Sequence, residues 1–365
     1  MSSSATVWDA VDAAINSNNT VLLDQASQLQ ILPIRWLWPG WLARGKLHVL
    51  AGTPGTGKTT IAMAIAATVS AGGIFPCGSQ CPSGNVLIWT GEDDPADTLT
   101  PRLLASGANL NRVYFINSTI ENGQTRSFDP AYDFQSLLQS AERIGEIKLL
   151  VVDPIVSAVV GDSHKANDVR RGLQPLVELA IALNCVVLGI THFSKGSMGR
   201  DPIERVMGSQ AFGALARVVI VAAKDSSNDE GSPPRRFIAR AKSNIGPDGG
   251  GFDYAMDQID LAEHPGVSAT VIKWRGAING SARDLLGAVE AENNDASDKT
   301  ERDDAKAFLI SILSEGAVAV KTIKNDAQGA GYSWRTIERA KKEAGIQAKK
   351  TGVKDGWSWE LKQTF

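Results

Sequence analysis

Residues 48–66, HVLAGTPGTGKTTIAMAIA, limit the possible folds more than any other stretch of the chain. An apolar run leads into a loop of small residues, and a helix-like pattern follows the loop. The segment 52–59, GTPGTGKT, fills every fixed position of the phosphate-binding pattern G-x-x-x-x-G-K-[ST] in its expected strand–loop–helix context. Glycines let backbone N–H groups surround a polyphosphate, and the N-terminus of the next helix adds partial positive charge. The sequence therefore predicts a nucleotide-binding loop after a buried strand.

Two side chains of this loop have specific expected roles. Lys58 can bridge the β- and γ-phosphates of a nucleotide, and the Thr59 hydroxyl can coordinate Mg²⁺. We therefore predict that ATP and Mg²⁺ bind here. The residues expected at the nucleotide are Gly52, Thr53, Pro54, Gly55, Thr56, Gly57, Lys58, Thr59 and Thr60.

The composition is that of a globular chain long enough for one large and one small domain. Hydrophobic residues make up 43% of the 365 positions and charged residues 21%. The formal net charge of −3 produces no overall basic field of the kind that marks many nucleic-acid-binding proteins. No apolar stretch approaches the roughly 20 residues of a membrane span, and the first residues lack the pattern of a secretory signal. We expect a cytoplasmic protein with no membrane partner.

The three cysteines, an odd number, do not indicate a disulfide scaffold. Cys77 and Cys81 are four positions apart, but a zinc site needs two further ligands, and the histidines at 164, 192 and 264 are distant in sequence. We therefore predict two ordinary loop thiols and no structural metal.

Short β-rich runs between residues 46 and 286 predict a mixed α/β domain. The runs are at 46–52, 84–91, 112–117, 148–154, 185–192, 217–225, 235–243 and 269–276. Helix-like segments such as 59–72 and 173–184 separate the early runs, which is typical of a mostly parallel sheet with helices on both faces. The later runs follow without long helices, so we expect them to form an antiparallel extension.

The flanking regions differ from this central domain. Residues 1–45 form an N-terminal segment, with one or two short helices expected over 5–28 and with Trp36, Trp38 and Trp41 expected to cover the edge of the sheet. Residues 287–304 contain seven acidic and two basic residues, which predicts a solvated acidic linker.

Residues 305–365 predict a small winged-helix-like domain. An amphipathic helix at 305–316 precedes a helix-turn-helix pair at 320–331 and 333–345, and 346–361 resembles a β-hairpin. From Lys321 onward ten Lys/Arg stand against five Asp/Glu, a net charge of +5, so the remainder of the chain carries −8. The domain could bind duplex DNA, recognise an origin or dock a partner protein, and the sequence leaves these alternatives open.

Two acidic residues complete the expected ATPase chemistry. Asp153 ends the apolar run KLLVV and is the expected second anchor for Mg²⁺. Many P-loop ATPases place a glutamate directly after this aspartate, but Pro154 stands there, so the group that orients water must come from elsewhere. Glu92, just after the strand at 85–90, is the candidate. Its neighbours Asp93 and Asp94 are expected to cap the following helix.

These features together resemble the RecA/DnaB superfamily, and most closely the RepA-type hexameric replicative helicases of plasmids and phages. The resemblance rests on the loop at 52–59, the stretch 84–110 around Glu-Asp-Asp-Pro, the bare aspartate at 153 and the later strand ending in THFSK, and it covers about 40–280. It implies a RecA-like core, a hexameric ring and movement along single-stranded DNA. It also makes His192 the sensor of the γ-phosphate, at the strand end where parallel sheets bind ligands.

The resemblance also implies residues that act on a neighbouring subunit. The stretch 235–244 resembles the strand whose basic residues reach the adjacent nucleotide, and Arg240 and Lys242 are expected on one face of it by alternation. Arg205 has the spacing found in DnaB-like proteins, whereas Met207 stands where the RepA pattern has an arginine. Which arginine acts in trans therefore stays open.

In this family the loops after Asp153 and after His192 face the pore and touch single-stranded DNA. Basic residues in such loops suit contacts to the phosphate backbone without sequence readout. The candidates are Lys165, Arg170, Arg171, Lys195, Arg200 and Arg205.

Three functions are compatible with these residues. The first is an ATP-driven ring motor on single-stranded DNA, a replicative helicase of a plasmid, phage or integrated element. The second is a RecA-like ATPase stimulated by DNA that does not unwind it, such as a recombination mediator. The third is a DNA-binding initiator or regulator in which ATP only switches assembly.

Overall fold

A computed structural model describes residues 21, 23–163, 165–194, 197–206, 210–225, 234–314, 316–350 and 356–361. The chain divides into two compact units, Met1–Arg35 and Trp36–Phe365, which are described separately. In the first unit the only helical element among the described residues is a 3₁₀ turn, η1 (Ala26–Gln28). The helices expected over 5–28 fall mostly on residues outside the described ones.

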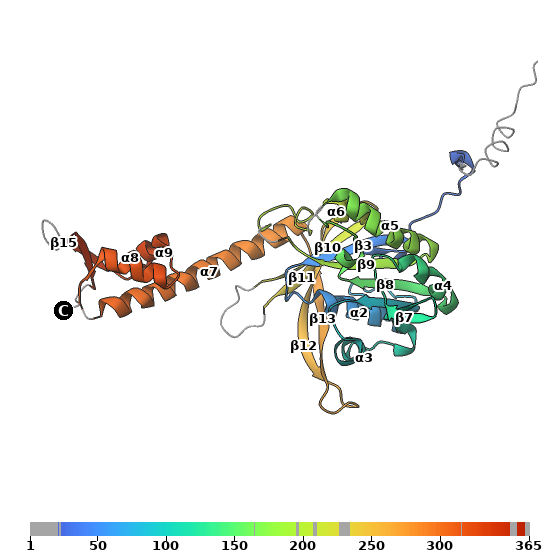
Figure 1. The fold of residues 1–365 in the computed structure, drawn as a ribbon, viewed down its shortest axis with the longest axis horizontal. Helices are drawn as coiled ribbons and strands as arrows, with labels where there is room; N and C mark the ends of the chain where they lie inside the picture. Colours follow the sequence, from blue (N-terminus) through green and yellow to red (C-terminus); the bar gives the residue numbers. More distant parts are fainter. Residues whose placement is uncertain are drawn as a thin grey trace, which may run out of the picture. The chain divides into compact units, whose positions relative to one another are not determined.

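A nine-stranded sheet forms the centre of the second unit (Figure 1). Six neighbouring strands are parallel, and three more continue the sheet in antiparallel pairing. In spatial order the parallel strands are β10 (Val218–Lys224), β3 (Lys46–Gly52), β9 (Val186–His192), β8 (Ile147–Asp153), β4 (Asn85–Thr90) and β5 (Val113–Phe115). The antiparallel strands are β11 (Arg236–Ser243), β12 (Gly251–Asp260) and β13 (Ser268–Ile278). The predicted mixed sheet with its antiparallel extension is confirmed.

Helices cover both faces of this sheet (Figure 1). On one face lie α2 (Lys58–Ala71), a π-helical turn η2 (Pro95–Leu99) and α3 (Thr100–Ala105). On the other lie α4 (Phe134–Ile144), α5 (Ala166–Ala182) and α6 (Gln210–Leu215). The parallel strands β3, β8, β9 and β10 are buried on both faces, which explains their nearly continuous apolar sequences. Short elements between them are η3 (Leu110–Arg112), η4 (Ile155–Ala158) and the hairpin of β6 (Ser118–Glu121) and β7 (Gln124–Ser127).

The tryptophan segment belongs to this core rather than to a separate N-terminal part. A short hairpin of β1 (Trp36–Trp38) and β2 (Leu42–Ala43) carries Trp38, which is fully buried and stacks on Trp41 and Phe75. Trp38 also contacts aromatic rings of β12 and β13. The tryptophans therefore pack against the antiparallel strands, and the compact unit begins at Trp36 rather than at 46.

Residues 282–313 form one continuous helix, α7 (Ala282–Leu313), across the segment expected to be a linker. Ala282, Leu286 and Val289 pack on strands β10 and β11, and Ala305, Leu309 and Leu313 belong to a separate cluster. That cluster also includes residues of β14 (Val318–Ala319), α8 (Val320–Gly329), α9 (Trp334–Glu343) and β16 (Trp357–Glu360), and β15 (Gln347–Lys350) lies beside β16. Strands β15 and β16 pair antiparallel, as the expected hairpin requires. No helix among the described residues is both long and apolar enough to cross a membrane.

Candidate functional site

The phosphate-binding loop has the expected strand–loop–helix geometry. Strand β3 ends at Gly52, and α2 begins at Lys58. Gly55 and Gly57 have φ angles of +76° and +83°, which side-chain-bearing residues rarely adopt. The loop can therefore turn its backbone N–H groups inward at the N-terminus of α2, as an anion site requires.

Lys58 lies inside this loop. Its ammonium donates hydrogen bonds to the carbonyl oxygens of Gly52 and Thr53, at 3.1 and 3.0 Å. Burial lowers the pKa of Lys58 to about 8, although Asp153 and Glu92 act in the opposite direction. A largely buried cation without a direct ion pair favours an anionic ligand, and the phosphates of a nucleotide fit this requirement.

The two residues expected at Mg²⁺ are in contact. The Thr59 hydroxyl donates a 2.7 Å hydrogen bond to Asp153 Oδ2, and Asp153 is only 4% exposed at the end of β8. Burial raises the pKa of Asp153 to about 6, and the charges of Glu92 and Asp93 add to this effect. A carboxylate and a hydroxyl beside the phosphate loop are the oxygen ligands that Mg²⁺ prefers. These residues therefore fit a nucleotide-bound magnesium ion.

His192 ends strand β9, beside the start of the phosphate loop. Strand β9 separates β3 from β8, and His192 pairs in register with Gly52. Its Nδ1 is 3.2 Å from Lys58 Nζ. Since an ammonium group cannot accept a hydrogen bond, Nδ1 must accept. Burial and, to a smaller extent, Lys58 lower the pKa of His192, so the neutral imidazole is the favoured form.

Glu92 follows strand β4 at the same edge of the sheet. Its side chain is exposed, and its backbone N–H bonds to the Thr90 hydroxyl at 3.3 Å. The Glu92 charge is close enough to raise the pKa values of Lys58, Asp153 and His192. The structure therefore brings together Lys58, Thr59, Asp153, His192 and Glu92, as the sequence predicts.

The two acids after Glu92 have different roles. Asp94 caps η2 by accepting hydrogen bonds from the N–H groups of Ala96 and Asp97, as expected. Asp93 does not cap this helix. It forms a 2.9 Å ion pair with Arg102 of α3, which follows η2 directly. The expectation of a capping role for Asp93 is wrong.

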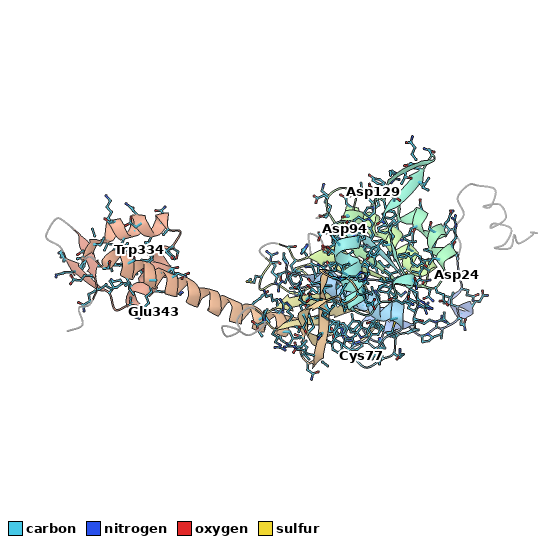
Figure 2. All side chains as sticks on the ribbon, turned by 90° about the horizontal axis from the view of Figure 1, so that it is seen from below. Asp24, Cys77, Asp94, Asp129, Trp334 and Glu343 are labelled. Carbon is cyan, nitrogen blue, oxygen red and sulfur yellow. The ribbon has the colours of Figure 1, made fainter. Side chains whose placement is uncertain are left out.

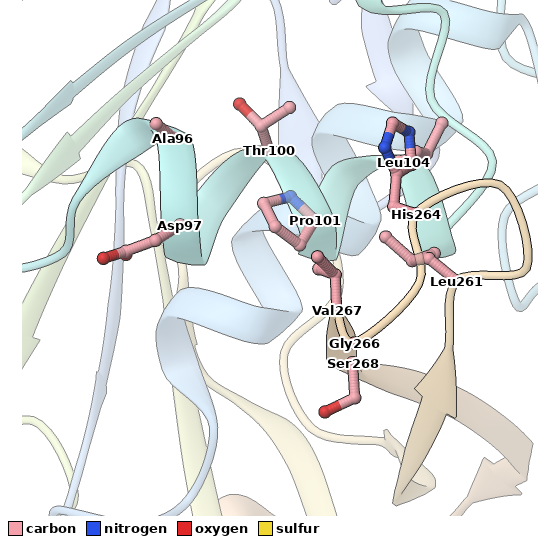
Figure 3. Close-up of a pocket in the computed structure, with 10 residues that line it drawn as sticks. All are labelled: Ala96, Asp97, Thr100, Pro101, Leu104, Leu261, His264, Gly266, Val267 and Ser268. Carbon is pink, nitrogen blue, oxygen red and sulfur yellow. The ribbon is translucent and has the colours of Figure 1, made fainter.

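A cavity of about 400 Å³ lies beside this segment (Figure 3). One wall is formed by η2 and α3, through Asp97, Pro101 and Leu104. The other is the turn between β12 and β13, which contributes His264 and Val267. The cavity thus adjoins the helix that follows Glu92 rather than the phosphate loop.

Two residues of β12 contact the phosphate loop and were not predicted from the sequence. The buried Tyr254 hydroxyl donates a hydrogen bond to the carbonyl oxygen of Thr56. A Cβ atom added to Gly57 would lie 2.6 Å from Met256 Sδ. No local motif marks these residues. The alternation of Phe252, Tyr254 and Met256 was the available signal for a strand with one buried face.

Arg240 and Lys242 do not share a face of β11. A β-bulge places Lys242 opposite Val219 and Arg240 opposite Ile220, so the extra residue reverses the alternation. The Arg240 guanidinium donates to the carbonyls of Gly40 and Gly249, whereas Lys242 donates to carbonyls of the α6 region. The expectation of a shared face is wrong.

Arg205 is also placed differently from the expectation of an exposed, DNA-facing residue. It is 4% exposed, and its guanidinium forms a 2.5 Å ion pair with Glu290 of α7. It also lies over the ring of Phe193, 4.4 Å from the centroid. An exposed position for Arg205 is therefore wrong, because the first turns of α7 cover it.

The other DNA-binding candidates are distributed over two segments. Arg170 and Arg171 are exposed, but they lie in the first turns of α5 rather than in a loop, and Lys165 is its N-cap residue. Arg200 is exposed in the segment 197–206. Lys195 lies outside the described residues. A shallow pocket on α5 includes Arg170 and Arg171.

The cysteines remain free thiols in the structure. Cys77 is exposed on a surface loop (Figure 2), whereas Cys81 is buried. Within the described part of the chain, no group of three His, Cys, Asp or Glu side chains could hold a metal ion.

A mixed sheet with a phosphate loop, Lys58 and Asp153 at its carboxyl edge defines a P-loop nucleotide-binding protein. The family model described as an AAA domain matches residues 15–198, half of the chain. The chain therefore belongs to this family of P-loop ATPase domains, which bind nucleotide, usually with Mg²⁺. The matched region ends before β10 and so does not include β12. No curated protein matches the chain.

Proposed function

We propose that the chain is an ATP-driven motor that moves along single-stranded DNA as a homo-oligomeric ring, a replicative helicase of a plasmid, phage or integrated element. The observation that carries this proposal is the arrangement of Glu92 and His192 around Lys58 and Asp153. Glu92 replaces the missing glutamate after Asp153, and His192 contacts the lysine that would hold the γ-phosphate.

Each residue of the site would have a separate role in ATP hydrolysis. Lys58 and the loop amides hold the phosphates, while Thr59 and Asp153 hold Mg²⁺, which would neutralise phosphate charge. Glu92 would orient and deprotonate the attacking water. Loss of the γ-phosphate would return Lys58 to His192 and the loop carbonyls, the contacts seen here. Because His192 precedes the segment with Arg200, this change would reach a candidate DNA-binding segment.

The proposed contact with single-stranded DNA uses exposed cations on two segments. Arg170 and Arg171 lie on α5, which follows the Asp153 strand, and Arg200 lies after the His192 strand. We expect the Arg170→Ala/Arg171→Ala double variant to lose most DNA stimulation of ATP hydrolysis and to lower the salt slope of binding to single-stranded DNA by about 1.4. Arg143→Ala, at an exposed position on α4, is the matched control.

Ring assembly requires residues that act across a subunit interface. Arg240 and Lys242 are the candidates, and both hydrogen-bond to backbone carbonyls of their own chain. In the register of the sheet, Lys242 lies opposite Val219, which pairs with Val49, three positions before the strand end at Gly52. That register sets Lys242 roughly 10 Å along the strand direction from the start of its own phosphate loop.

Mixing inactive subunits tests this assignment. Lys58→Ala subunits would lack nucleotide binding, and Arg240→Ala subunits would lack the residue supplied to the neighbour. If Arg240 acts in trans, mixing the two variants restores ATP hydrolysis. The active sites then combine Lys58 from an Arg240→Ala subunit with Arg240 from a neighbouring Lys58→Ala subunit. No recovery refutes Arg240 as the residue supplied in trans, and a persistent monomer with a non-hydrolysable ATP analogue and single-stranded DNA refutes the ring.

Residues 305–365 are proposed to form a winged-helix-like domain that binds duplex DNA or docks a replication protein. Helices α8 and α9 precede the β15–β16 hairpin, and α9 exposes Arg335, Arg339 and Lys342. Removal of residues 316–365 should leave ATP hydrolysis stimulated by single-stranded DNA intact and abolish binding to duplex DNA or to the partner.

One observation favours a second function, a RecA-like ATPase that does not unwind DNA. Arg205 is buried and Arg240 is anchored to its own chain, so neither is exposed toward a neighbour here. Displacement of a strand from a forked substrate separates the two functions. ATP hydrolysis stimulated by single-stranded DNA without displacement supports the second.

The Glu92→Gln variant distinguishes a motor from an initiator or regulator in which ATP only switches assembly. A motor loses activity in this variant while retaining ATP binding, whereas an ATP-switched initiator or regulator keeps full biological activity. Glu263→Gln, at an exposed position in the β12–β13 turn, is the control.

A further inference from the structure

Strand β12 of the antiparallel extension contacts two consecutive residues of the phosphate loop, Thr56 and Gly57. The Tyr254 hydroxyl bonds to the Thr56 carbonyl, and Met256 lies against Gly57. Tyr254 is 198 positions away from Thr56 in sequence, so only the fold brings them together. We propose that Tyr254 is a positioning residue that orients the phosphate loop for nucleotide binding.

The environment of Tyr254 keeps its hydroxyl in the donor form. The side chain is 1% exposed and packs edge-on to Trp274 of β13, with ring centroids 5.9 Å apart. Burial raises the pKa of Tyr254, so the phenol remains protonated at neutral pH. The backbone of Tyr254 pairs with strands on both sides, opposite Arg236 of β11 and Trp274 of β13. The donor is therefore fixed in place.

The contact controls the direction of a backbone N–H group. The Thr56 carbonyl and the Gly57 N–H belong to one planar trans peptide, so they point in opposite directions. When Tyr254 holds the carbonyl, the Gly57 N–H is directed away from β12. Rotation of this peptide would otherwise be easy, because Gly57 has a φ of +83° and no side chain. The hydrogen bond thus fixes one of the amides that a P-loop uses to bind phosphate.

Met256 limits the same region by packing. A Cβ atom at residue 57 would lie 2.6 Å from its sulfur, so the end of the Met256 side chain would have to move to admit one. Packing against Met256 cannot select the orientation of the peptide, however. We therefore expect loss of the Tyr254 hydroxyl to weaken phosphate binding more than truncation of the Met256 side chain does.

The test uses the full-length chain and the Tyr254→Phe variant, which removes only the hydroxyl. We expect the Kd values for Mg-ATP and for inorganic tripolyphosphate to rise by the same factor, roughly three- to tenfold, as for loss of one buried hydrogen bond. Tripolyphosphate carries no base or sugar, so an equal factor assigns the effect to the phosphate loop. We expect KM for ATP to rise by a similar factor with kcat changed less than twofold.

Phe252→Leu is the matched control, because it removes aromatic packing from the same strand without touching the loop. It should lower Tm and leave both Kd values unchanged. An unchanged tripolyphosphate Kd in folded Tyr254→Phe, or a larger effect from Met256→Ala, would overturn the proposal. The proposal rests on nucleotide binding at this loop, and failure of the unmodified chain to bind ATP would instead refute that function.

Discussion

The buried histidine of the strand before the phosphate loop makes the stability of this chain depend on pH. His48 lies in β3 with no exposed surface, and its Nε2 accepts a hydrogen bond from the Ala43 N–H at 3.0 Å. Burial lowers its pKa from 6.5 to about 4. As pH falls below 6.5, the unfolded chain takes up a proton that the folded chain refuses until about pH 4. The free energy of unfolding therefore falls with decreasing pH across this window.

The magnitude follows from the two pKa values. The difference between 6.5 and about 4, at 1.36 kcal/mol per pH unit, corresponds to about 3 kcal/mol for the complete loss. Between pH 7.5 and pH 4.5, most of it, about 2.5 kcal/mol, should disappear. This is a large fraction of the stability of a typical domain. The loss would act directly on the strand that carries the phosphate loop.

Urea unfolding at pH 7.5 and 4.5, at constant ionic strength, measures the effect. Tryptophan fluorescence is a suitable probe, because Trp38 and Trp41 are buried beside the β2 segment that His48 contacts. In His48→Gln the amide oxygen can still accept from Ala43, but it does not titrate. We expect the variant to lose about 2.5 kcal/mol less than the unmodified chain over this range. Equal pH dependence of the two proteins would refute the reasoning.

Three further predictions concern the site and its support. Glu92→Gln should lower kcat for ATP hydrolysis by about 10²-fold or more with little change in ATP affinity, as measured by turnover and by equilibrium binding. Glu290→Leu should lower the free energy of urea unfolding by about 3–5 kcal/mol, because it leaves the Arg205 charge buried alone. The double variant with Arg205→Met should recover most of this loss, and simple additivity of the two changes would contradict the expectation. Mg-ATP at 100 times its Kd should stabilise the chain by about 2.7 kcal/mol, and either EDTA or Lys58→Ala should remove most of that gain.

The phosphate site could be predicted from the sequence because its parts are local. A glycine-rich loop, an aspartate and a histidine each end an apolar run, and residues at the carboxyl ends of parallel strands meet at one edge of the sheet. Each of these residues is identified by its own few neighbours in the chain. At this edge the structure places His192 Nδ1 3.2 Å from Lys58 Nζ and Asp153 Oδ2 2.7 Å from the Thr59 hydroxyl, while the roles of these residues stay predictions.

The errors arose where a side chain depends on a distant partner or on an irregular backbone. A basic residue in a glycine-containing loop is typical of an exposed nucleic-acid contact, but Glu290, 85 positions later, buries Arg205 against α7. Alternation assigned Arg240 and Lys242 to one face, and the bulge between them adds a residue that no local pattern marks. Both errors concern the basic residues expected to contact DNA or a neighbour.

The structure also explains why the phosphate loop alone does not define the site. Strand order decides which ends are neighbours, and the insertion of β9 between β3 and β8 places His192 between the lysine and the aspartate. The antiparallel extension adds a contact from the other side, because it returns β12 to the loop and sets Tyr254 against Thr56. Lys58 thus contacts His192 directly, and its loop is bonded to a strand outside the parallel sheet. If Tyr254 fixes the Thr56–Gly57 peptide as proposed, the antiparallel extension contributes to the nucleotide site as well as to the sheet.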